Sequence, residues 1–296
     1  MTNNVQFSPS QSSPLQQHSS GMSYPIANFV GYDRFSSQHW SFLASITAGS
    51  EPVSYNEAMR DERWREAMRK EIQALEENGT WTVEDLPVGK KAIGSKWVYK
   101  IKYNSDGSIE RCKARLVILG NNQKEGIDYH ETFAPTAKMA TIRTFLAVAA
   151  AKNWELHQLD VQNAFLHGDL TEEVFMKMPP GFASITPGKV CRLRRSLYGL
   201  HQAPRCWFAK LADSLKTYGF HQSYSDYSLF AFHEQYVQIH VLVYADDLII
   251  SGNDATAVQR VKKYLSSCFH MKDLGQLKYF LGIEVARNAE GVFLCQ

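Results

Sequence analysis

Residues 236–251, YVQIHVLVYADDLIIS, contain two very apolar stretches that meet around an acidic pair. Their β-branched and aromatic residues predict two strands. Asp246 and Asp247 fall at the tip between these strands. A charge at the end of an apolar strand is costly unless water or a metal ion solvates it. An ordinary acidic hairpin turn explains the pair as well as a metal site does, since turns commonly contain Asp.

A second acid follows another short apolar strand, residues 154–161 (WELHQLDV), and this acid is Asp160. Taken alone, such a residue is more often the N-cap of a helix than a ligand. Asp160 lies 86 residues before Asp246, and this spacing does not show that the two meet. If they meet, their carboxylates provide the oxygen ligands that magnesium prefers and that two-metal phosphoryl transfer requires.

A long hairpin with a basic face is predicted over residues 96–117. Apolar residues alternate with Lys100 and Lys102 in its first half, a turn follows at 104–107, and Lys113 and Arg115 share one face of its second half. A solvated strand edge protected by lysine is one interpretation. The other is a surface that binds triphosphate or a nucleic-acid backbone.

Four helices are predicted from the spacing of apolar residues. They cover residues 55–78, 138–152, a stretch through Trp207 and Leu215, and 254–269. Ser54 with Glu57 forms a capping box before the first.

Composition narrows the class of protein. The chain has 296 residues, 44% of them hydrophobic, and a formal net charge of +2, which excludes a wholly disordered or histone-like protein. Its five cysteines have no CxxC spacing, so reduced intracellular thiols are expected. Neither a membrane span nor a secretory signal is predicted. Residues 1–23 are rich in Ser and Gln and are predicted to be a disordered linker, within a loosely packed segment 1–50.

Five blocks of sequence, taken together, resemble the reverse transcriptase of copia-type LTR retrotransposon polyproteins. In chain order they are GTWTVEDLPVGKKAIGSKWVYKIKYNSDGSIERCKARLV, GIDYHETFAPTAKMATIR, QLDVQNAFLHGDLTEEVFMKMPPGF, SLYGLHQAPRCWF and LVYADDLIISG. The resemblance covers roughly residues 51–296 and is specific, because the blocks follow the family's order. In this frame the ordinary hairpin turn becomes an improbable explanation of the acidic pair.

The resemblance implies an α+β fold, a right-hand polymerase core whose palm has an antiparallel sheet with flanking helices. Fingers (80–135) and palm (136–175 and 200–290) are interleaved in the sequence, and the thumb is largely missing. The resemblance assigns the catalytic and metal-binding roles to Asp160, Asp246 and Asp247, with the Val161 carbonyl completing one shell around two Mg²⁺ ions. Lys272 is implied as the lysine that protonates pyrophosphate.

Substrate contacts are implied in the same way. The residues that match the family's nucleotide-binding positions are Lys100, Lys102, Arg115, Phe165, Tyr198 and Gly199. Among these, Phe165 matches the aromatic gate that excludes a ribose 2′-hydroxyl. Phe280, Leu281 and Gly282 resemble the primer grip. His201 is a departure, because the family usually has Lys there and a neutral imidazole contacts phosphate more weakly.

The implied function is RNA- or DNA-directed DNA synthesis from deoxynucleoside triphosphates on a template-primer. Ribonuclease H and integrase parts are expected in a complete element, so the sequence is interpreted as a truncated fragment. Two alternatives stay open: an inactive remnant that only binds nucleic acid, and a sequence that is not expressed as protein.

Overall fold

The structure is a computed structural model that describes Ser36 and residues 50–104, 106–182, 188–288 and 291–295. The predicted linker over residues 1–50 therefore lies outside the described residues, apart from Ser36 and Ser50. The chain divides into two compact units: residues 1–50 with 103–109, and residues 51–102 with 110–296. The candidate site lies entirely within the second unit.

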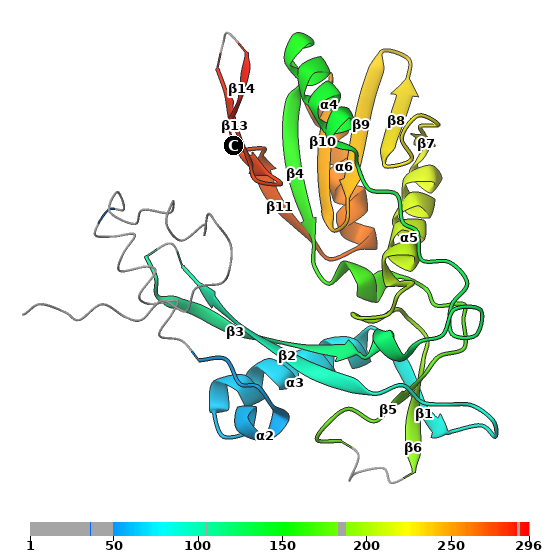
Figure 1. Cartoon of the computed structure of the whole chain (residues 1–296). Helices are drawn as coiled ribbons and strands as arrows, with labels where there is room; N and C mark the ends of the chain where they lie inside the picture. The colour runs from blue at the N-terminus through cyan, green and yellow to red at the C-terminus, as the bar shows by residue number, and fades with distance from the viewer. Residues whose placement is uncertain (1–35, 37–49, 105, 183–187, 289–290, 296) are drawn as a thin grey trace, which may run out of the picture. The chain divides into compact units, whose positions relative to one another are not determined.

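The largest sheet in the described part of the second unit has six antiparallel strands (Figure 1). Its strand order is β11 (Met271–Gln276), β4 (Glu155–Val161), β10 (Asp247–Gly252), β9 (Val237–Tyr244), β8 (Leu229–Glu234) and β7 (His221–Gln222). The strands predicted on either side of the acidic pair are β9 and β10, which confirms that interpretation of the sequence. The order itself joins segments more than 100 residues apart.

Both faces of this sheet are covered. Apolar side chains of α5 (Ala203–Tyr218) and α6 (Ala255–Cys268) share one core with Leu159 and Leu248. On the other face, α4 (Met139–Ala151) shares a second core with Leu156 and Ile249. Because alternate residues of a strand point to opposite faces, Asp160 and Asp247 lie on the α4 side. The helices predicted over 138–152 and 254–269 are confirmed to within one residue at each end, and the helix predicted through Trp207 and Leu215 is α5.

A small three-stranded sheet continues the α4 side of the structure. It consists of β12 (Tyr279–Phe280), β13 (Ile283–Arg287) and β14 (Val292–Cys295). The side chain of Phe280 is 2% exposed and belongs to the same core as α4.

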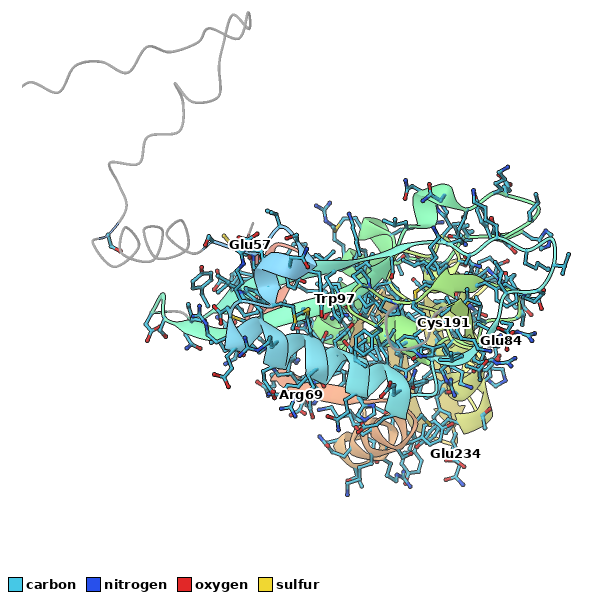
Figure 2. The ribbon with its side chains drawn as sticks, turned by 90° about the horizontal axis from the view of Figure 1, so that it is seen from below. Glu57, Arg69, Glu84, Trp97, Cys191 and Glu234 are labelled. Carbon is cyan, nitrogen blue, oxygen red and sulfur yellow. The ribbon has the colours of Figure 1, made fainter. Side chains whose placement is uncertain are left out.

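The N-terminal part of the second unit is built on the predicted hairpin of β2 (Ser95–Tyr103) and β3 (Ile109–Ile118). Trp97, Tyr99 and Ile101 are buried on β2, as the alternation predicts. Helix α3 (Glu62–Glu77) packs against them, with the rings of Trp64 and Tyr99 5.3 Å apart. Figure 2 labels Trp97 within this part of the structure and Arg69 on α3, whose side chain is 75% exposed.

The single helix predicted over residues 55–78 is wrong in one respect. The structure has α2 (Tyr55–Ala58) and then α3, with a turn between them. Asp61 causes the break, because its carboxylate accepts a hydrogen bond from the Arg63 N–H at 2.8 Å and so begins a new helix. The Ser54 cap is confirmed, since its hydroxyl accepts from the Glu57 N–H at 3.3 Å.

A fourth sheet belongs to the same unit. It pairs β1 (Trp81–Asp85) with β6 (Lys189–Leu193), and β6 with β5 (Phe175–Lys177). A short 3₁₀ helix, Gly120–Asn122, follows β3, and another, Ala164–His167, follows β4. The α+β class with antiparallel sheets and flanking helices is thereby confirmed, whereas the residue ranges of fingers and palm stay a prediction. No helix in the described part of the chain is long and apolar enough to cross a membrane.

Candidate active site

The acidic pair lies on a tight turn that closes the β9–β10 hairpin. Tyr244 and Asp247 are paired across the strands, which leaves Ala245 and Asp246 as the two turn residues. Ala245 has a φ of 54°, in the left-handed region that is unfavourable for a residue with a Cβ. The indole N–H of Trp207, on α5, donates to the Ala245 carbonyl at 2.8 Å. This hydrogen bond ties the turn to the helix beneath it.

Asp160 is brought to the same place by the pairing of β4 with β10. Asp160 lies directly opposite Asp247 in that ladder, and directly opposite residues of an antiparallel pair have Cβ atoms about 4.5–5.5 Å apart. The N–H of the next residue, Val161, donates to the Asp246 carbonyl at 2.9 Å. The structure therefore places Asp160, Asp246 and Asp247 at one end of two adjacent strands.

A polar pocket of about 440 Å³ opens beside these strand ends. Asp160, Val161, Asp246 and Lys272 line its floor. Its other walls come from α3 and β3 and include Lys70, Glu71, Arg111, Lys113 and Arg115. Asp247 is not among the lining residues; its Oδ1 accepts a hydrogen bond from the Gln158 amide at 3.1 Å.

The surroundings of two of these carboxylates, Asp160 and Asp247, are unfavourable to the ionised form. Burial, and then the charge of Asp246, raise the pKa of Asp160, while Lys272, Lys113 and Arg115 act in the opposite direction. Burial also raises the pKa of Asp247, and the hydrogen bond from Gln158 opposes that rise. Like charges gathered at a half-buried site favour a cation, because a bound cation reverses both effects.

The donor chemistry of this site fits magnesium, which prefers carboxylate and carbonyl oxygens. The described residues do not contain three His, Cys, Asp or Glu side chains already arranged around one point. Mutual repulsion of the carboxylates gives a physical reason for the open arrangement. The pocket thus has the ligand types for a hard divalent cation but not a closed cage.

A stack of three side chains forms another part of the site. The guanidinium carbon of Arg115 lies 4.0 Å from the centre of the Tyr198 ring, and the Tyr198 and Phe165 rings meet edge to face at 5.2 Å. Within the described residues, Nη1 of Arg115 is buried without a hydrogen-bond partner. An unpaired buried donor in a pocket suits an anionic ligand. Burial raises the pKa of Tyr198 to about 12, so its hydroxyl stays protonated.

Glycine is required where this stack joins β3. Gly199 has a φ of +94°, and a Cβ there would lie 2.2 Å from the Ile118 carbonyl oxygen. The Ile118 N–H donates to the Tyr198 carbonyl at 2.8 Å. The backbone of residues 198–199 therefore lies directly on the end of β3, and this contact sets the distance between Tyr198 and Arg115.

Several residues assigned by resemblance lie away from the pocket. Lys100 is paired with Glu51 at 3.2 Å, and neither Lys100 nor Lys102 lines the pocket. Phe280 is buried in the core under α4, and Leu281 and Gly282 have positive φ values of 52° and 83° in the turn between β12 and β13. The ring of His201 packs at 5.0 Å from that of Tyr129. Lys272 does reach the pocket, paired across the ladder with Asp160.

The sequence did not predict a role in the site for three residues beside the acidic pair and the pocket: Glu71, Gln158 and Trp207. Glu71 is 8% exposed and accepts a hydrogen bond from the Leu116 N–H at 3.4 Å. It falls on the same stripe of α3 as the buried residues Trp64, Met68 and Ile72, and a charge on an apolar stripe is a usable signal. Gln158 lies two residues before Asp160, hence on the same face of the strand.

Known proteins are similar in sequence to most of this chain. Residues 78–296 match the family model described as reverse transcriptase (RNA-dependent DNA polymerase). The retrovirus-related Pol polyprotein from transposon RE2 of Arabidopsis thaliana is 47% identical over 261 residues, 88% of this chain and 18% of its own length. The corresponding polyprotein from transposon TNT 1-94 of Nicotiana tabacum is 42% identical over 82% of this chain and 19% of its own length.

The chain therefore spans about a fifth of the curated relatives that it matches. Among solved structures, the crystal structure of prototype foamy virus protease-reverse transcriptase aligns with 70% of this chain and 22% of that chain, at a TM-score of 0.37 and 16% identity.

Proposed function

The chain belongs to the reverse transcriptase (RNA-dependent DNA polymerase) family, and from this premise we propose that it adds deoxynucleotides to the 3′-hydroxyl of a primer paired to an RNA or DNA template. One observation carries the proposal: Asp160 and Asp246 share a single pocket with Arg115, Lys113 and Lys272. Carboxylates for metal on one side and cations for phosphate on the other are the parts that phosphoryl transfer needs.

Asp160, Asp246 and Asp247 would hold two magnesium ions, with the Val161 carbonyl as a further ligand. Magnesium, when bound, supplies activation of the primer hydroxyl and stabilisation of the leaving pyrophosphate. The protein's own contribution is to hold the carboxylates at the strand ends, through the β4–β10 pairing and the hydrogen bond from Trp207 to the turn. Positioning of this kind supplies much of the rate in phosphoryl transfer.

Arg115 and Lys113 would bind the incoming triphosphate. The Arg115 guanidinium lies over the Tyr198 ring, and its buried, unpartnered Nη1 would donate to a phosphate oxygen. Phe165 packs on Tyr198 and would occupy the space of a ribose 2′-hydroxyl. Lys272 would donate the proton to the leaving pyrophosphate. Lys100 and Lys102 would contact the nucleic-acid backbone rather than the nucleotide, since they do not line the pocket.

The primer is assigned to the β12–β13 turn. Leu281 and Gly282 form this turn with positive φ values. The buried side chain of Phe280 anchors the turn to the core under α4. In the same proposal, this chain works beside the other parts of a copia-type polyprotein, ribonuclease H and integrase, because its relatives are Pol polyproteins.

A second candidate function is nucleic-acid binding without polymerisation. The observation that favours it is the open arrangement of acidic side chains, with no group of three in the described residues ready to hold a metal. Such a protein would bind template through its basic residues and leave the primer unchanged.

Primer extension separates the two functions. The protein is incubated with an oligo(dT) primer on a poly(rA) template, dTTP and MgCl₂, in parallel with a gel-shift measurement on the same template-primer. The proposal expects extension that EDTA abolishes and that Asp246→Asn reduces below detection, with binding retained. Asp85→Asn is the matched control, because this exposed residue on β1 pairs only with Lys189 in the described structure and should extend normally. A gel shift without extension in the unmodified chain supports the second function instead.

A further inference from the structure

Gln158 lies near the acidic turn, and its side chain hydrogen-bonds to only one of the three aspartates, Asp247. It lies on β4, two residues before Asp160, and so points to the same face of the sheet. Its side-chain Nε2 donates to Oδ1 of Asp247 at 3.1 Å. Within the described structure this is the only hydrogen bond recorded for the Asp247 carboxylate. Gln158 itself does not line the pocket.

The surroundings of Asp247 differ from those of Asp160. Three cations of the pocket, Lys272, Lys113 and Arg115, act on the Asp160 carboxylate. The interactions found for Asp247 are burial, the charges of Asp246 and Asp160, and the Gln158 amide. The amide is the one favourable partner in that set. Removing it leaves a half-buried carboxylate among like charges, and such a group rotates away or moves to relieve repulsion.

We propose that Gln158 is a positioning residue, which fixes the rotamer of Asp247 by occupying Oδ1 and so presents Oδ2 as the oxygen available to a divalent cation. The inference rests on the proposed polymerase function and deepens it. In metal sites generally, partners that orient a ligand from behind change metal affinity or activity by about 10–100-fold when they are removed. A glutamine placed here merely to fill space would show no such dependence.

The test replaces the donor and keeps the shape. Gln158→Met has the same chain length and no N–H group, and Gln158→Asn keeps an amide but withdraws it from Asp247. Gln238→Met is the matched control, because Gln238 is a half-buried glutamine on β9 of the same sheet whose amide oxygen contacts Lys152 at 3.5 Å. Circular dichroism and thermal unfolding check that all variants fold as the unmodified chain does.

Two measurements are made on the full chain. The first is Mn²⁺ affinity, from the EPR signal of free Mn²⁺ during titration without nucleotide. The second is primer extension at saturating and limiting template-primer. Gln158→Met and Gln158→Asn are expected to bind Mn²⁺ about 10-fold more weakly and to lose kcat by a similar factor. The KM for template-primer should stay unchanged, and Gln238→Met should match the unmodified chain in every readout.

The outcomes distinguish this inference from the proposed function. Equal Mn²⁺ affinity in Gln158→Met and the unmodified chain overturns the inference, whether or not primers are extended. Weaker Mn²⁺ binding in Gln158→Met, in a chain that does not extend primers, supports the inference and overturns the polymerase proposal. A chain that binds no Mn²⁺ at all overturns both.

Discussion

Replacing Gly199 by alanine tests how the Tyr198–Gly199 segment is held on β3. An alanine Cβ would lie 2.2 Å from the Ile118 carbonyl oxygen, whereas Cβ atoms in proteins essentially never come closer than 3.0 Å to such an atom. The segment must therefore move. Alanine must also adopt a φ of +94°, which favours glycine.

The expected loss in the free energy of unfolding is the sum of the backbone strain and of the interactions that this movement breaks. The left-handed backbone costs alanine roughly 1–2 kcal/mol. The hydrogen bond from the Ile118 N–H to the Tyr198 carbonyl, now 2.8 Å long, contributes about 1 kcal/mol. Loosening Arg115 from the Tyr198 ring loses about 0.5–1 kcal/mol more. The free energy of unfolding should fall by about 3 kcal/mol, which corresponds to roughly 6–12 °C in Tm for a chain of this size.

Gly89→Ala is the control, since Gly89 also has a positive φ, +82°, but has nothing within 4 Å of an added Cβ. It carries only the backbone part of the cost, about 1–2 kcal/mol. Urea unfolding of both variants, followed by tryptophan fluorescence, measures the difference. Equal losses in the two variants would refute the close contact between residue 199 and β3, and with it the proposed support for Arg115.

Three further predictions concern the site itself. Trp207→Phe keeps an aromatic ring but removes the N–H that donates to the acidic turn at 2.8 Å. The kcat should fall about 5-fold, because a hydrogen bond of about 1 kcal/mol no longer fixes the turn, and an unchanged kcat would contradict this. Phe165→Val should raise ribonucleotide incorporation relative to deoxynucleotide, which gel analysis of products with each triphosphate measures; constant discrimination would place the gate elsewhere. Asp160→Asn should abolish extension yet raise the Tm in EDTA at pH 7. The raised pKa of Asp160 means that the folded protein binds its proton more tightly than the unfolded one, so stability is highest below the ordinary value of 3.8 and declines as pH rises through the raised value. A lower Tm for Asp160→Asn would contradict that sign.

The strands and helices of this chain follow largely from local pattern. Alternation of apolar residues predicts β2, and the two apolar runs around the acidic pair predict β9 and β10. The break between α2 and α3 escapes that pattern, because the apolar stripe runs through it while Asp61 caps a second helix. Strand order escapes it too, since β4 lies between β10 and β11 through contacts far apart in the sequence.

The basic hairpin shows why a site is harder to predict than a fold. Both of its strands carry lysine or arginine, and nothing in the sequence decides which strand faces the aspartates. The structure decides it through α3, whose Trp64 packs on Tyr99 of β2 and whose Glu71 accepts a hydrogen bond from Leu116 of β3. With α3 in that position, Lys113 and Arg115 line the pocket and Lys100 pairs with Glu51.

Glu71 and Gln158 show how much a polar residue within an apolar pattern can reveal from the sequence alone. Glu71 is a charged residue on the apolar stripe of α3, and Gln158 is a polar residue within the short apolar strand β4, so each is detectable from the sequence. Their partners are not detectable in this way, because Leu116 lies 45 residues from Glu71 and Asp247 lies 89 residues from Gln158. Burial raises the pKa of Glu71, against the pull of Arg115. A buried acid beside the cations of β3 competes with phosphate for them, whereas an amide behind Asp247 adds no charge and strengthens a metal ligand. A polar residue within an apolar pattern thus has opposite consequences at these two positions, and the difference depends on which charged group the fold places next to it.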